Sequence, residues 1–85
     1  MRKQVMDTKT LEKIAKQAAA EIGLNPNLVA AHARRNTEDS ERGTMFVQFW
    51  LPNEEEVVEF EVRVDATSEL IQEEIMRKLK EKLGL

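Results

Sequence analysis

The sequence has no cysteine, two prolines, three glycines and one histidine among its 85 residues. Without cysteine there is no disulfide, no thiol nucleophile and no cysteine-ligated metal site. No apolar run approaches the roughly 20 residues that a membrane-spanning helix needs, and no secretory apolar segment follows the first basic residues. The sequence therefore predicts a cytoplasmic protein with no membrane attachment.

The remaining composition is that of a folded domain, with 41% hydrophobic and 34% charged residues. These proportions exclude collagen-like, low-complexity and disordered chains. The length suits one small domain, residues 1–85. The net charge of −3 is unevenly distributed, because residues 1–44 contain eight basic and six acidic residues whereas residues 45–85 contain five and ten. Such an asymmetry is compatible with a nucleic-acid-binding end and with two ordinary solvated surfaces.

A first amphipathic helix is predicted over residues 8–22. Asp7 and Thr8 are both suitable N-cap residues, and Gly23 is suited to the left-handed conformation that ends many helices. The apolar positions between them recur at the spacing of one helical stripe: Leu11, Ile14, Ala15, Ala18, Ala19 and Ile22.

A second helix is predicted over residues 26–35. Asn25 followed by Pro26 combines an N-cap with a proline at the first helical position, where its missing N–H costs nothing. Residues 36–44 contain no apolar side chain and are expected to form an exposed loop. Residues 1–6 are expected to form a flexible arm or a short extra strand.

The hydrophobic period changes to two after residue 44, which predicts a β-hairpin. Its strands are residues 45–51 and 57–64, and Pro52 supplies the turn between them. One face of the hairpin is expected to lie on a core. The large apolar side chains of both strands share that face: Met45, Val47, Phe49, Leu51, Val58, Phe60, Val62 and Val64.

A last helix is predicted from Thr67 or Ser68, either of which can act as N-cap, to Gly84. The resulting order of helix, helix, strand, strand and helix gives an α+β fold, ααββα, with the helices on one face of the hairpin. Its core is expected to contain Leu11, Ile14, Ala18, Ile22, Leu28, Val47, Phe49, Phe60, Val62, Ile71, Ile75 and Leu79.

The sequence contains no arrangement of residues that is typical of catalysis. His32 is the only histidine and has no second ligand at metal-binding spacing. Ser40 and Ser68 have no base evident in the sequence, and the glycines are too scattered for a phosphate-binding loop. The sequence therefore predicts a protein that is not an enzyme and that binds no cofactor or metal ion.

The junction of the two predicted helices resembles the helix-turn-helix motif of DNA-binding proteins. Ala19 is a small residue four positions before the turn glycine, Gly23, and Leu24 and Val29 follow at apolar positions. The alternative is an ordinary helix–helix corner, since any tight corner needs similar residues. The resemblance implies a recognition helix with four polar residues that face bases and phosphates: Asn25, Asn27, Arg34 and Arg35.

Phe46 and Trp50 are unusual because the predicted register places them opposite the core, where polar side chains are expected. Gln48 and Val57 lie beside them on the same face. Large exposed aromatic residues are typical of surfaces that another molecule covers. The alternative is that residues 2–6 or the connecting loop cover them.

The predicted function is that of a small non-enzymatic interaction or regulatory module. We expect it to form homodimers, or to bind another protein, through the sheet face that carries Phe46, Gln48, Trp50 and Val57. The alternative is a DNA-binding regulator that uses the corner at residues 8–35, with nucleic acid as its partner.

Overall fold

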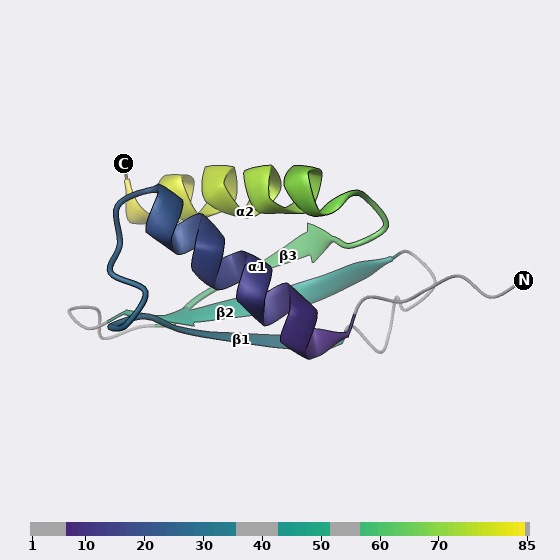
Figure 1. The fold of residues 1–85 in the computed structure, drawn as a ribbon, viewed down its shortest axis with the longest axis horizontal. Helices are drawn as coiled ribbons and strands as arrows, with labels where there is room; N and C mark the ends of the chain where they lie inside the picture. The colour runs from purple at the N-terminus through teal and green to yellow at the C-terminus, as the bar shows by residue number, and fades with distance from the viewer. Residues whose placement is uncertain (1–6, 36–42, 52–56, 85) are drawn as a thin grey trace, which may run out of the picture.

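The computed structural model describes residues 7–35, 43–51 and 57–84. These residues form a three-stranded antiparallel sheet of order β1-β2-β3, with two helices packed against each other on one face (Figure 1). The predicted α+β class is confirmed, but one helix rather than two precedes the hairpin. The elements follow in the order α1 (Thr8–Glu21), β1 (Ala30–Arg35), β2 (Thr44–Trp50), β3 (Val58–Arg63) and α2 (Ser68–Leu83).

The first helix forms where its N-cap predicts it. The Asp7 carboxylate accepts a hydrogen bond from the Thr10 backbone N–H at 2.7 Å, which satisfies one of the free donors at the start of the helix. The same hydrogen bond holds the pKa of Asp7 below its ordinary value. After the helix, Gly23 has a φ of 99°, a left-handed conformation that glycine adopts without strain.

The predicted second helix over residues 26–35 is wrong, because this segment forms a turn followed by β1. The Asn25 side-chain oxygen accepts a hydrogen bond from the Asn27 N–H at 2.9 Å, and the Leu28 N–H donates to the Asn25 carbonyl oxygen. This local turn competes with helix formation, and the chain becomes extended directly after it. Leu28, which was expected in the core, is 59% exposed.

The strand β1 is stabilised by pairing with β2, the next strand along the chain. Each of its six residues has a partner on β2. Burial follows the period of a strand, since Ala33 is buried between the exposed residues His32 and Arg34. Backbone hydrogen bonds to β2 and burial beneath α1 therefore outweigh the helical preference of this alanine-rich segment.

The predicted hairpin is present as β2 and β3, with the register that its period of two predicts. Val47 lies opposite Phe60, and the ring centroids of Phe49 and Phe60 are 5.9 Å apart on the face beneath the helices. The predicted turn, the predicted arm and most of the predicted loop fall on residues outside the described part of the chain: 52–56, 1–6 and 36–42. The predicted loop is one residue too long, because Thr44 is the first residue of β2.

The last helix also forms as predicted. Thr67 is its N-cap and accepts a hydrogen bond from the Leu70 N–H at 3.3 Å, and Gly84 ends it. Ten of the twelve predicted core residues are buried and Ile22 is partly buried against them. Leu28 is therefore the one member of the predicted core that lies at the surface.

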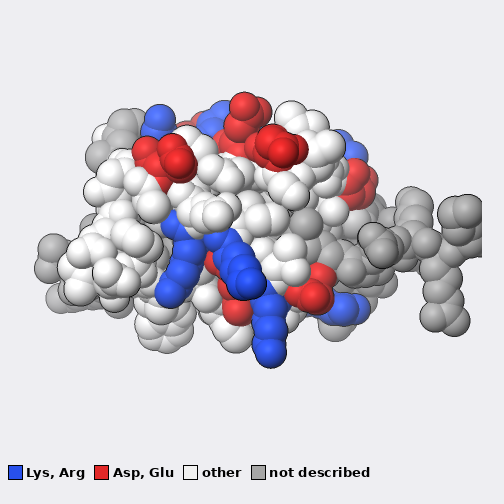
Figure 2. Space-filling model, viewed as in Figure 1, with Lys and Arg blue, Asp and Glu red and all other residues white. Residues whose placement is uncertain are grey.

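The fold places residues 7–35 toward the β1 edge of the sheet and residues 57–84 toward the β3 edge. Helix α1 packs on β1 and α2 packs on β3, while β2 lies between the two strands. Residues 7–35 contain five basic and three acidic residues, whereas residues 57–84 contain five and seven. Figure 2 shows long basic side chains projecting on the α1 side with acidic side chains among them, and side chains of both signs along α2. Charge is thus distributed unequally across the strands.

Candidate interaction surface

The candidate site is the face of the sheet that points away from the helices, which we call the outer face. Because side chains alternate along a strand, it contains every second residue of each strand. The strand register aligns these residues in rows that cross the sheet: Ala30 with Trp50, His32 with Gln48 and Glu59, Arg34 with Phe46 and Glu61, and Thr44 with Arg63.

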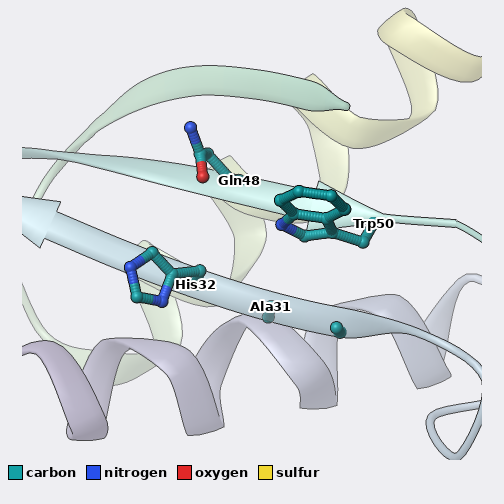
Figure 3. A pocket seen from close by; sticks show the side chains of 5 residues that line it. Ala31, His32, Gln48 and Trp50 are labelled. Atoms are coloured by element: carbon teal, nitrogen blue, oxygen red, sulfur yellow. The ribbon is translucent and has the colours of Figure 1, made fainter. Parts of the chain in front are cut away.

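Trp50 is the most exposed large apolar residue of the outer face, with 55% of its surface accessible. Val57, directly before β3, is 36% exposed, and Ala30 is exposed opposite Trp50 on β1. We call Ala30, Trp50 and Val57 the Trp50 corner. Figure 3 shows the shallow hollow beside it, which Trp50 lines together with His32 and Gln48.

Phe46 is only partly exposed, in contrast to Trp50, and Arg34 lies over its ring. The guanidinium carbon of Arg34 lies 4.6 Å from the ring centroid, and its Nη2 atom lies 3.4 Å from Glu59 Oε2. Gln48 Nε2 donates to the same carboxylate oxygen at 2.9 Å. The centre of the outer face is therefore a cation–π and hydrogen-bonded cluster, and its exposed apolar area lies at the Trp50 corner.

Only part of the outer face is predicted correctly from the sequence. Three residues of β1 belong to this face although residues 26–35 are predicted to form a helix: Ala30, His32 and Arg34. The four residues predicted for the interface all lie on the side expected from the period of two: Phe46, Gln48, Trp50 and Val57.

The four residues of the DNA-binding alternative do not share a surface. Asn25 and Asn27 lie in the turn before β1, whereas Arg34 and Arg35 are the last residues of that strand. Arg34 belongs to the outer face and Arg35, its neighbour, to the opposite face. The DNA-binding alternative therefore loses the recognition helix on which it rested.

Charged side chains of the helices occupy both edges of the sheet. At the β1 edge, the Glu12 carboxylate of α1 accepts a hydrogen bond from the Ala33 N–H at 2.9 Å. At the β3 edge, Glu74 of α2 accepts from the Arg63 N–H at 3.1 Å, and Lys78 donates to a carbonyl oxygen of the same strand. Free edge N–H and C=O groups are what an added strand pairs with, so these contacts hinder strand addition at either edge.

Removing the Glu12 carboxylate is expected to destabilise the β1 edge. Glu12→Ala leaves the part-buried Ala33 N–H without its acceptor, and we expect the free energy of unfolding to fall by about 1 kcal/mol. Chemical denaturation measures this loss, and hydrogen exchange of the Ala33 amide should become faster. Glu12→Gln is the matched control, because its amide oxygen can still accept the hydrogen bond. Equal losses in the two variants would show that the hydrogen bond does not stabilise β1.

The described residues contain no group of three or more histidine, cysteine, aspartate or glutamate side chains that could hold a metal ion. His32 Nδ1 lies 3.4 Å from Glu12 Oε2, and the histidine side chain is 64% exposed. Neither α1 nor α2, the two helices of the described segments, has the length and apolar character needed to cross a membrane.

Neither a protein-family model, nor a curated protein, nor a solved structure matches this chain. Its function is therefore inferred from the outer face and the two occupied edges.

Proposed function

We propose that this protein is a small non-catalytic interaction module that forms a reversible homodimer through the outer face of its sheet. The observation that carries the proposal is the 55% exposure of Trp50 on a face that neither α1 nor α2 covers. Exposed aromatic side chains are enriched where another protein surface covers them.

The helix contacts at the two sheet edges favour association through the outer face over association through an edge. Antiparallel strands can also join across the edges of two sheets, which buries backbone groups instead of the outer face. Here such pairing would have to displace Glu12 from the Ala33 N–H, or Glu74 from the Arg63 N–H. The outer face carries no comparable obstacle at the Trp50 corner.

The exposed area of Trp50 indicates the strength of the association. A tryptophan side chain presents up to about 250 Å², so an exposure of 55% leaves about 140 Å² accessible. At about 25 cal/mol per Å², burying Trp50 in both copies contributes about 7 kcal/mol before the cost of association. That cost is about 4–15 kcal/mol. Burial of Trp50 alone therefore offsets only part of the cost or exceeds it by about 3 kcal/mol at most. The other residues of the outer face have to supply the rest, and we expect a reversible dimer of about millimolar to micromolar affinity, not an obligate one.

Sedimentation equilibrium of the wild type from about 1 µM to about 1 mM should show a monomer–dimer equilibrium. Trp50 is the only tryptophan, so its fluorescence emission should shift to shorter wavelength as dimer forms. Trp50→Ser is expected to weaken dimerisation at least about tenfold, and Phe46→Ser combined with Trp50→Ser should give a folded monomer.

Leu70→Ser is the matched control for Trp50→Ser. Leu70 is 56% exposed, almost the same as Trp50, but it lies in the first turn of α2 on the helical layer. Its replacement should leave dimerisation unchanged. A wild type that remains monomeric at about 1 mM, or equal weakening by the two serine variants, would contradict the proposal.

A further inference from the structure

We infer that the two copies stack face to face about a two-fold axis that runs along β2, so that β1 of each copy lies over β3 of the other. This inference rests on the proposed function and specifies how the partner, a second copy of this chain, is oriented. The arrangement places Arg34 and His32 of β1 over Glu61 and Glu59 of β3 in the second copy.

A closed dimer that uses one surface twice needs a two-fold axis, which can run perpendicular or parallel to the sheet. An axis perpendicular to the sheet pairs edge with edge. The helices oppose this mode at both edges, through Glu12 on Ala33 and through Glu74 and Lys78 on β3. An axis parallel to the sheet brings the outer faces together. Such an axis keeps the strands of the two sheets aligned, the packing described for β-sandwiches, when it runs across the strands or along them.

An axis that runs across the strands places each strand over its own counterpart. The acidic residues Glu59 and Glu61 of β3 then lie over the β3 strand of the second copy, whose outer face carries the same two carboxylates and Arg63. Arg63 is paired with Asp65 of its own chain at 3.1 Å, so the carboxylates dominate this contact. Arg34 likewise lies over the other β1. Like charges that meet across an interface oppose association, so this orientation is disfavoured.

A two-fold axis along β2 leaves each row of the outer face at the same position along the strands. It places the β1 end of a row over the β3 end of the same row in the second copy. Arg34, Phe46 and Glu61 form one such row, so Arg34, which covers the Phe46 ring of its own copy, lies over Glu61 of the second copy. Glu61 also accepts a hydrogen bond from Thr44 Oγ1 of its own chain at 2.8 Å, so this contact adds a cation to a carboxylate that already has a partner. The next row brings His32 over Glu59 in the same way. Each contact occurs twice by symmetry.

The Trp50 corner fits the same orientation. Trp50 lies on β2, the strand nearest to the axis, so the two indole rings meet each other. Ala30 lies on β1, at the same end of the sheet as Val57 before β3, so the small Ala30 of one copy faces Val57 of the other. Two stacked sheets with roughly aligned strands are a common packing arrangement.

Charge inversion tests the predicted contact between β1 and β3. Arg34→Glu places an acidic residue over Glu61 and should weaken dimerisation at least about tenfold. Mixing this variant with a Glu59→Lys, Glu61→Lys variant should restore association as a heterodimer. Arg35→Glu is the matched control, because it makes the same change in charge on the opposite face of β1 and should leave dimerisation unchanged.

Thiol cross-linking tests the orientation, since the natural chain has no cysteine. Stacked sheets lie about 10 Å apart, beyond the reach of a disulfide, so a bis-maleimide with a span of about 10 Å should join mixed Arg34→Cys and Glu61→Cys chains into a heterodimer. Arg34→Cys chains alone should not cross-link, because the two β1 strands lie on opposite sides of the axis, about two strand spacings apart.

The outcomes separate this inference from the proposed function. A monomeric wild type overturns both. A wild-type dimer that Trp50→Ser weakens, but in which Arg34→Glu behaves like Arg35→Glu, overturns the orientation alone. Efficient cross-linking between two Arg34→Cys chains overturns it too, because β1 would then lie over β1.

Discussion

Phe49→Ala is expected to lower the free energy of unfolding by about 3–5 kcal/mol. Phe49 lies on the central strand and has no accessible surface, and its ring packs against Phe60 with the centroids 5.9 Å apart. Truncation removes the buried ring and leaves a cavity that the surrounding helices and strands can fill only in part. A small domain has a total stability of about 5–15 kcal/mol, so this one change removes a large share of it.

Trp50→Ala is the matched control, because Trp50 is the next residue of the same strand and projects to the other face. Its side chain is 55% exposed, and we expect its truncation to change the unfolding free energy by less than about 1 kcal/mol. Urea denaturation at a concentration that keeps the chain monomeric measures both variants. Losses of equal size would mean that the two faces of β2 are buried to a similar degree, and the assignment of an inner and an outer face would be wrong.

The hairpin and the two helices could be predicted because their signals are local. Asp7 and Thr67 are N-caps whose side chains accept the hydrogen bonds expected of them. The alternation of Val47 with its neighbours fixes which face of β2 is buried, since a shift by one residue would expose every apolar side chain. Such features depend on residues that are close in the sequence.

The strand β1 could not be predicted in the same way. Its residues Ala30, Ala31 and Ala33 favour a helix and lie on both faces of the strand, so the period of two is hidden by alanine. Asn25 and Pro26 added a helix start signal that the structure uses for a turn. What decides the conformation is the neighbouring strand β2, which begins several residues further along the chain.

The prediction of a helix in place of β1 also left the predicted outer face incomplete. Phe46 and Trp50 were identified from the alternation in β2, but their neighbours His32 and Arg34 were placed on a helix. One signal in the sequence favoured a further strand, because a hairpin alone has two open edges that proteins usually pair or cover. In the structure β1 pairs with one of them and charged residues of the helices occupy the edges that remain.

Ala18→Leu is expected to lower the free energy of unfolding, because α1 packs closely against its neighbours. Ala18 has no accessible surface and lies on the side of α1 that packs on the sheet and on α2. Two other alanines on this side, Ala15 and Ala19, are equally buried, so the helix is held close to its neighbours by small side chains. A leucine there has no space, and overpacking is expected to cost about 1–3 kcal/mol.

Ala20→Leu is the control for Ala18→Leu, because Ala20 is two residues further along the same helix and is exposed. Leucine and alanine are both good helix formers, so this substitution should change the unfolding free energy by less than about 0.5 kcal/mol. Thermal and urea denaturation of both variants give the comparison. If Ala18→Leu were as stable as Ala20→Leu, α1 would have room to move away from the sheet, and close packing through small residues would not be what holds it there.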